Sequence, residues 1–145
     1  MITWDVPKDN LDPEFAADVE KLLGEDLSSW IVYFGYRSCE EQERLYQNYL
    51  NGGPLAAPPG ESAHQCGLAV DVVLEIGGRE IWDTTNPAWQ RLWDMVKVHP
   101  RLHSGHEFPV ETHGKVGPDD DHIQAVKWIQ KREELKASGK WGKCG

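Results

Sequence analysis

The sequence predicts a single α+β domain in which helices flank a small antiparallel sheet. Its length and composition fit one domain, because 145 residues with seven Trp, four Tyr and three Phe can supply one sizeable core. Segments with helical periodicity alternate with short β-branched segments. The Pro- and Gly-rich stretch at 52–60 is too short to link two packed units. We therefore expect one domain over residues 1–138 and a loose tail over residues 139–145.

Helix starts are marked by side chains that can cap a first turn. Asp12 and Asn86 each precede a proline, and Ser38 has capping-box spacing to Glu41. Apolar residues recur at helical intervals after each of them. Helices are expected over residues 13–23, 39–50, 87–98 and, with a less regular pattern, 123–135.

Short runs rich in β-branched and aromatic residues predict the strands. They cover Trp30–Tyr36 and Ala69–Glu75, and the glycines at 77–78 can turn the second run back into Arg79–Trp82 as a hairpin. Residues 53–62 and the polar segment 99–121 predict irregular loops.

Charge and cysteine content exclude several classes of protein. A net charge of -9 and a pI near 5.0 argue against electrostatic capture of nucleic acid or an anionic membrane, because both need a basic face. No segment approaches the roughly 18 apolar residues of a membrane span, and the first residues lack a signal-peptide pattern, so we expect cytoplasmic synthesis and no membrane insertion. Cys39, Cys66 and Cys144 are odd in number and irregularly spaced, which favours free thiols.

The most informative segment is 62–71, in which a histidine and an aspartate lie seven residues apart. His64 and Asp71 offer a nitrogen and a carboxylate oxygen, which zinc binds at roughly 2.0 to 2.2 Å. On the predicted strand Asp71 shares a face with the small Ala69, which leaves room for a ligand. An aspartate in an apolar strand needs a metal, an arginine or hydrogen bonds to compensate its charge. The alternative is a surface-facing Asp71 on a half-exposed strand.

A third metal ligand must come from the histidines that follow. His99 fits a favourable charge at a helix C-terminus, whereas His122 stands out because three aspartates precede it. Two histidines and one carboxylate leave the fourth zinc position open, and a free carboxylate nearby can then accept a proton from water, as in hydrolases. The candidates for the third ligand are His103, His106, His113 and His122.

Asp119 and Asp120 are the better candidates for that free carboxylate. On an extended chain the side chain of Asp121 points away from that of its neighbour His122. The alternative for the three consecutive acids is a solvated loop or the start of a helix.

Two further blocks accompany the segment Ser62-x-His64-x-x-Gly67-x-Ala69-x-Asp71. The first is Tyr36-Arg37-Ser38 with Glu41-Gln42 and Leu45-Tyr46, and the last is Asp119-x-x-His122-x-Gln124. Together, over residues 30–125, they resemble the zinc peptidases of the D-alanyl-D-alanine carboxypeptidase and L-alanyl-D-glutamate endopeptidase family. The resemblance implies the fold that this family shares with the hedgehog signalling domain.

The resemblance also implies roles for the matching residues. His64, Asp71 and His122 match the three ligands of one zinc ion. Asp119 matches the acidic general base, and an aspartate there resembles the phage endolysin branch more than the carboxypeptidases.

Arg37, Ser62 and Gln42 match the substrate side of the family's site. Arginine suits a carboxylate, which it holds through two parallel hydrogen bonds, and together with zinc it can stabilise the oxyanion of amide hydrolysis. The alternative for Arg37 is a surface charge beside a helix start.

The last block departs from the family's pattern of Pro, His and an aromatic residue, often preceded by Glu-Trp-Gly-Gly. This chain has Asp121-His122-Ile123 and Gly105-His106-Glu107-Phe108 in those places. The departure leaves His106 or His113 open as a substitute ligand and Asp120 open as the base.

Three functions are compatible with these features. The first is an endolysin-type zinc endopeptidase that cuts the L-Ala–D-Glu bond of peptidoglycan stem peptides. The second is a D,D-carboxypeptidase or dipeptidase acting on terminal D-Ala. The third is a non-catalytic zinc-stabilised binding module, against which Asp119 beside His122 argues. We expect a monomer that acts on the cell wall after release from the cytoplasm.

Overall fold

A mixed sheet of six strands forms the centre of the computed structural model, which describes residues 1–54, 56–108 and 119–139. The strand order is β1-β2-β3-β6-β5, with β4 paired to β3. Among the described strands, β1 and β2 are parallel and the other pairs are antiparallel. The strands are β1 (Ile2–Trp4), β2 (Ser29–Phe34), β3 (Ala69–Ile76), β4 (Arg79–Ile81), β5 (Leu102–Ser104) and β6 (His122–Ala125).

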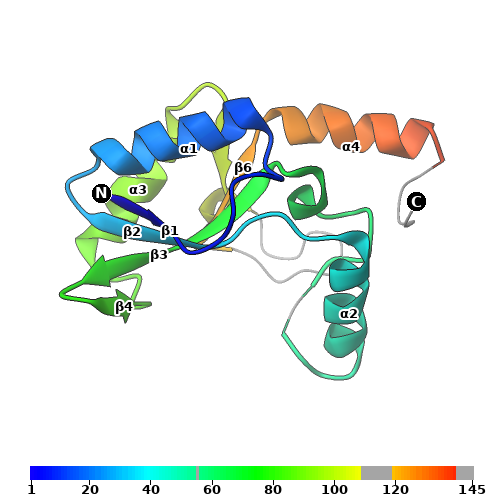
Figure 1. Ribbon diagram of the computed structural model, residues 1–145, viewed down its shortest axis with the longest axis horizontal. Helices are drawn as coiled ribbons and strands as arrows, with labels where there is room; N and C mark the ends of the chain where they lie inside the picture. Colours follow the sequence, from blue (N-terminus) through cyan, green and yellow to red (C-terminus); the bar gives the residue numbers. More distant parts are fainter. Residues whose placement is uncertain (55, 109–118, 140–145) are drawn as a thin grey trace.

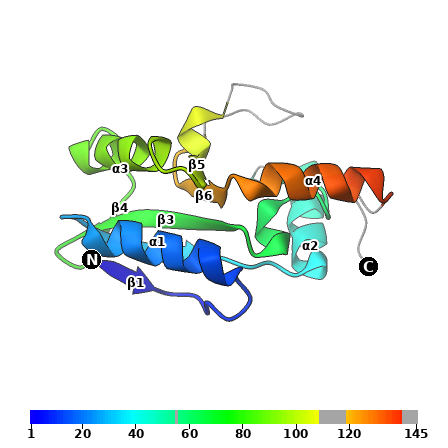
Figure 2. The ribbon, with the colours of Figure 1, turned by 90° about the horizontal axis from the view of Figure 1, so that it is seen from above.

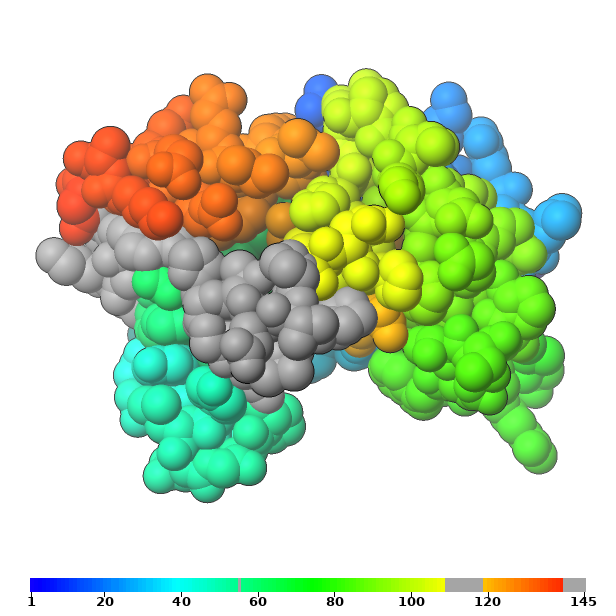
Figure 3. Space-filling view, turned by 180° about the vertical axis from the view of Figure 1, so that it is seen from behind, coloured from blue at the N-terminus to red at the C-terminus, as the bar shows by residue number. Residues whose placement is uncertain are grey.

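Four α-helices surround the sheet, which confirms the predicted α+β class. In Figure 1, α1 lies above the sheet and α2 lies at the lower right, beyond the end of the strands, and Figures 1 and 2 both show α4 extending away from the sheet. Seen from behind, α2 forms a separate lobe at the end opposite α3 (Figure 3). The helices are α1 (Pro13–Glu25), α2 (Cys39–Leu50), α3 (Pro87–Lys97) and α4 (Lys127–Ala137), with short 3-10 helices η1 (Ala63–Cys66) and η2 (Gly105–Glu107).

The core lies where α1 and α3 pack on the sheet. Phe15 of α1 and Trp89 of α3 are both 1% exposed, and Trp30 of β2 meets Trp89 edge to face at a centroid distance of 5.1 Å. Because Trp30 and Val32 face this core, the alternation of the strand sends Tyr33 to the opposite face. That opposite face carries the site.

The predicted helix starts are confirmed by their caps. The Asp12 carboxylate accepts a hydrogen bond from Phe15 N at 3.0 Å, and Ser38 Oγ accepts one from Glu41 N at 3.1 Å. Asn86 Oδ1 accepts one from Ala88 N at 3.0 Å. Each cap satisfies an amide that the first helical turn leaves unpaired.

Residues 122–125 correct the helix that the sequence predicts over 123–135. They form β6, which pairs with β3 and β5, and the helix begins only at Lys127. The apolar residues here fit both periodicities, and pairing with two strands decides between them. The strand β1 has three residues, too few to show an alternating pattern.

Cys39 is disulfide-bonded, so the expectation of a free thiol is wrong there. Sequence spacing does not reveal which sulfurs the fold brings together. Cys66 is free, and Cys144 lies outside the described residues, as does the tail beyond Gly139. Among the described helices none is both long enough and apolar enough to cross a bilayer.

Candidate active site

Two paired strands and one short turn bring His64, Asp71 and His122 together. Asp71 on β3 is the register partner of His122 on β6, and His64 lies in η1, directly before β3. The three residues are 4%, 7% and 7% exposed. One ligand atom from each lies within 4.8 Å of the others, so this group can hold a metal ion.

Gly67 explains the glycine of the motif between His64 and Asp71. Its φ of 67° is left-handed, and an added Cβ would overlap the carbonyl oxygen of Asn10 and lie 3.1 Å from Asp12 N. The Gly67 carbonyl accepts a hydrogen bond from Asp12 N at 2.9 Å. The turn that carries His64 is therefore held against the start of α1.

Hydrogen bonds on the far side of each imidazole decide which nitrogen faces Asp71. His64 Nδ1 donates to the Gly35 carbonyl at 2.8 Å, which leaves Nε2 at 3.4 Å from Asp71 Oδ2. His122 Nε2 donates to Gln124 Oε1 at 2.9 Å, which leaves Nδ1 at 3.1 Å from Asp71 Oδ1. Metal-binding histidines are commonly oriented in this way, so the donor set fits zinc.

The electrostatics of these groups fit a cation between them. Burial lowers the pKa of His64. Burial also opposes protonation of His122, but the hydrogen bond and charge of Asp71 outweigh it and raise the pKa of His122. Despite its burial, Asp71 has a pKa well below the usual range because His64 and His122 face it. A divalent cation can replace the proton on His122, since a ligating imidazole is neutral.

Two further carboxylates lie beside the three candidate ligands. Asp119 Oδ2 is 3.9 Å from His122 Nδ1, and the Asp119 side chain is 48% exposed. Carboxylate oxygens of Asp71, Asp119 and Asp121 lie within 4.8 Å of one another. Asp119 therefore combines nearness to the candidate ligands with access to solvent.

Asp121 does not point away from the site as an extended chain would require. His122 N donates to the Asp119 carbonyl at 3.2 Å, so residues 119–122 form a turn. The Asp121 carboxylate accepts a hydrogen bond from the Tyr33 hydroxyl of β2. Burial, with the Asp71 charge and the Asp119 contact, raises the pKa of Asp121 to about 7.

Asp120 and His106 bind each other outside this group. The Asp120 carboxylate lies 2.7 Å from His106 Nδ1, and the His106 ring stacks on Trp93 at 3.6 Å with an interplanar angle of 1°. Trp93 Nε1 donates to the Asp120 carbonyl at 2.9 Å. His103 on β5 is also absent from the described ligand groups, and His113 lies outside the described residues.

Arg37 also lies beside Asp71. Its Nη2 is 3.6 Å from Asp71 Oδ2, and its Nη1 donates to Gln42 Oε1 at 3.3 Å. Gln42 is fully buried, and its Nε2 donates to the Ala57 carbonyl at 2.7 Å. The fixed Gln42 amide therefore holds the Arg37 guanidinium in place. Ser62 Oγ accepts from His64 N at 3.3 Å and caps η1.

Gly105 allows the Asp119 segment to lie close to β5. Its carbonyl accepts a hydrogen bond from Asp119 N at 2.9 Å. An added Cβ would overlap the Asp119 carbonyl oxygen and lie 2.8 Å from His122 Cβ. The glycine thus has a steric role beside the candidate base.

The family model of VanY, D-alanyl-D-alanine carboxypeptidase, matches residues 8–132. The chain belongs to this family. Membership confirms the predicted class, a zinc peptidase of peptidoglycan peptides. No curated protein matches the chain.

Solved structures share the fold of this VanY-family chain. The L-Ala D-Glu endopeptidase ChiX of Serratia marcescens has a TM-score of 0.60 at 20% identity, over 85% of this chain and 86% of that one. DacB of Streptococcus pneumoniae has 0.58 at 25%, over 96% and 84%. The VanY D,D-pentapeptidase of a VanB-type cassette, solved with Zn(II), has 0.56 at 20%, over 92% and 80%.

Tyr33 and the role of Gln124 were missed by sequence reasoning. Gln124 lies two residues after His122, so a strand would have placed both side chains on one face. The helix expected over 123–135 gives no such placement. Nothing local to Tyr33 indicates its contact with Asp121, 88 residues away.

Proposed function

We propose that the chain is a zinc-dependent peptidoglycan hydrolase that cleaves the L-Ala–D-Glu amide bond of stem peptides. The observation that carries the proposal is the convergence of His64, Asp71 and His122 beside a solvent-accessible carboxylate, Asp119. Two histidines, one aspartate and an open position are the pattern of catalytic rather than structural zinc.

The proposed roles follow from the orientation of each group. His64 Nε2, His122 Nδ1 and the Asp71 carboxylate would hold the zinc ion, because these atoms face one another. When bound, zinc supplies the Lewis acidity that activates water and polarises the scissile carbonyl.

Asp119 and Arg37 supply the rest of the proposed chemistry. The Asp119 carboxylate accepts the proton of the attacking water and returns it to the leaving amine. The Arg37 guanidinium holds a substrate carboxylate and, with its charge beside Asp71, stabilises the oxyanion. Gln42 orients Arg37, and Ser62 lines the substrate side next to His64.

The choice of bond rests on the base and on one neighbour. An aspartate at position 119 resembles the endolysin branch of the family, and ChiX, an L-Ala D-Glu endopeptidase, shares the fold. The second candidate is D,D-carboxypeptidase action on terminal D-Ala. It is favoured by the family model and by a VanY structure in complex with D-alanine-D-alanine.

Mass spectrometry of digested peptidoglycan tests these candidates. Purified peptidoglycan is treated with the zinc-loaded chain, with Asp119→Ala and with the chain in EDTA. Products that end in a new L-Ala carboxylate, formed by the zinc-loaded chain alone, support the endopeptidase. Loss of terminal D-Ala assigns the carboxypeptidase instead. No product from any sample favours a binding module, and a zinc content near zero refutes the metal site.

We further propose an endolysin-type setting, in which a monomer reaches the wall after release from the cytoplasm. The net charge of -9 supports capture of the substrate by the candidate active site itself rather than through anionic wall polymers. Light scattering of the purified chain should give the mass of one copy.

A further inference from the structure

Three aromatic rings lie on the site face of the sheet, and we call Trp82, Tyr33 and Phe34 the aromatic row. The neighbours Tyr33 and Phe34 share this face because an irregularity between Val32 and Phe34 interrupts the alternation of β2. Tyr33 meets Trp82 edge to face at a centroid distance of 5.3 Å, and its ring is tilted against that of Phe34 at 5.2 Å. Trp82 directly follows β4, and the other two end β2. Phe34 is 41% exposed and Trp82 51%, so the row presents apolar surface to solvent. Contiguous exposed apolar surface commonly marks a binding site.

The aromatic row is continuous with the candidate active site. The Tyr33 hydroxyl donates to Asp121, whose carboxylate lies beside those of Asp71 and Asp119. Phe34 is the register partner of Asp71, and the Arg37 guanidinium lies 4.8 Å from the Phe34 ring centroid. A ligand on these rings would therefore extend directly to the reacting groups.

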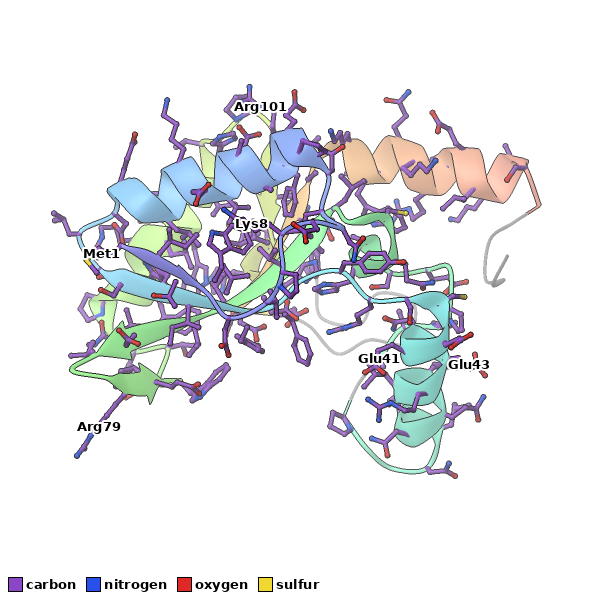
Figure 4. The ribbon with its side chains drawn as sticks, in the orientation of Figure 1. Met1, Lys8, Glu41, Glu43, Arg79 and Arg101 are labelled. Carbon is purple, nitrogen blue, oxygen red and sulfur yellow. The ribbon has the colours of Figure 1, made fainter. Side chains whose placement is uncertain are left out.

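Trp82 and Arg37 lie on opposite sides of Asp71 along the strand direction. In β2, Tyr33 precedes the residue paired with Asp71, and Arg37 follows it. Trp82 contacts Tyr33 and so lies on the same side of Asp71 as Tyr33, toward the β3–β4 hairpin. Figure 4 shows this hairpin, labelled at Arg79, at one end of the molecule and α2, labelled at Glu41 and Glu43, at the other. A peptide that crosses the site with a carboxylate on Arg37 points its other end toward the aromatic row.

We propose that the aromatic row, with Trp82 as its main contact, is a subsite for the amino sugar that carries the stem peptide. This inference rests on the proposed L-Ala–D-Glu cleavage. One residue spans at most about 3.6 Å, so a sugar attached to the residue before the scissile bond must lie beside the site. A sugar ring offers a C–H face that packs on an aromatic ring while its polar edge stays in water.

The chemistry of the surface favours a sugar over an anionic polymer. The chain has a net charge of -9, and the exposed part of the row is aromatic rather than basic. Cleavage at a terminal D-Ala would place the sugar several residues farther away, beyond direct reach of these rings. The subsite therefore fits the proposed endopeptidase and not the D,D-carboxypeptidase.

The test compares two substrates that differ only in the sugar. The zinc-loaded full chain is given N-acetylmuramoyl-L-Ala-D-Glu-L-Lys and the same tripeptide with an acetyl group in place of the sugar. We expect a higher kcat/KM for the muramoyl peptide, and Trp82→Ala should lower the ratio of the two kcat/KM values about fivefold. Trp82→Tyr should retain most of the preference, because it keeps an aromatic face.

Ile76→Ala is the matched control, since Ile76 at the end of β3 is also apolar and 51% exposed. It should leave the ratio unchanged. No sugar preference in the wild type, or an unchanged ratio in Trp82→Ala, overturns the proposal.

A binding measurement separates this inference from the proposed function. Saturation-transfer NMR with the muramoyl peptide and the zinc-loaded chain should show sugar-ring signals that Trp82→Ala loses. If neither peptide is cut, the proposed function fails while this signal still tests the subsite. Sugar-ring signals that are absent, or unchanged in Trp82→Ala, refute the subsite.

Discussion

Gln124 and Gly35 act at the scale of single residues, because each accepts a hydrogen bond from the outer nitrogen of one histidine. The Gly35 carbonyl orients His64 and the Gln124 amide orients His122, at 2.8 and 2.9 Å. An imidazole fixed in this way presents its other nitrogen without further loss of entropy. The two contacts are therefore as much a part of the candidate metal site as its ligands.

Replacing Gln124 with methionine should weaken zinc binding. Met fills a similar volume but offers His122 no strong acceptor, so the zinc affinity should fall about 10- to 100-fold. Competition with a chromogenic chelator measures it. Gln90→Met, on the exposed face of α3, is the control and should bind zinc like the wild type. Equal affinities for Gln124→Met and wild type would contradict the orienting role.

Asp119→Asn should remove the proposed general base while leaving the three candidate ligands in place. We expect kcat to fall about 10²- to 10⁴-fold with nearly unchanged zinc affinity. Asp121→Asn is the informative comparison, because Asp121 also lies beside Asp71 but is bound by Tyr33. A larger loss of kcat in Asp121→Asn would move the base to that residue.

At the element scale, the turn over 119–122 depends on its contact with η2. Gly105→Ala places a methyl group against the Asp119 carbonyl oxygen and His122 Cβ. Neither atom is the end of a flexible side chain that could move away. The chain must shift, so we expect a loss of about 1–3 kcal/mol in the free energy of unfolding, together with a lower kcat. Urea unfolding and peptide hydrolysis measure the two effects.

Gly24→Ala is the control for that substitution. An added Cβ in α1 meets only Ile2 Cγ2 at 3.8 Å, an ordinary contact. Because alanine favours a helix over glycine, this variant should gain up to about 1 kcal/mol in stability. Similar losses in both variants would show that the Gly105 effect is not steric.

At the scale of the whole molecule, Asp26 at the end of α1 connects this helix to β2 and α3. Its carboxylate accepts hydrogen bonds from Trp30 Nε1 at 2.8 Å, Arg91 Nε at 3.0 Å and Ser28 N at 3.2 Å. Burial alone would raise the pKa of Asp26, but the bonds from Arg91 and Trp30 outweigh burial and lower it. The charged carboxylate therefore stabilises the folded chain.

Acid should remove this contribution. Since the pKa of Asp26 is lower in the folded than in the unfolded chain, its stabilisation is present above the unfolded value of about 3.9 and is lost as the pH falls through the folded value. At neutral pH, Asp26→Asn should cost about 1–3 kcal/mol. Urea unfolding between pH 7 and pH 2.5 should show this difference shrinking in acid. Asp9 is exposed, so Asp9→Asn is the control and should unfold like the wild type. A difference in unfolding free energy between Asp26→Asn and the wild type that does not change with pH would contradict the linkage.

Zinc removal should lower the stability of the whole chain. A ligand that binds only the folded state at 100 times its Kd adds about 2.7 kcal/mol. We therefore expect the melting temperature to rise on addition of zinc, to return in EDTA, and to remain unchanged with magnesium. His122→Ala should abolish the rise, and a zinc effect that survives this substitution would place the ion elsewhere.

Much of the fold was predictable because it rests on contacts within a few residues. The helix starts at 13, 39 and 87 depend on caps two or three residues away. The strand with Asp71 and the hairpin at Gly77-Gly78 likewise follow from short-range backbone preferences. The spacing of His64 and Asp71 is also a short-range feature, so the sequence alone indicates a metal site there.

The tertiary structure decided what depends on distant pairing. His122 meets Asp71 across 51 positions and Tyr33 meets Asp121 across 88, so no local pattern predicts either contact. The same applies to β6, which becomes a strand because β3 and β5 flank it, and to Asp120, which binds His106 rather than the site. Residue types and short spacings determine the chemistry available to this chain, whereas long-range strand pairing determines which carboxylates share the site, because only the folded sheet brings them within hydrogen-bond reach.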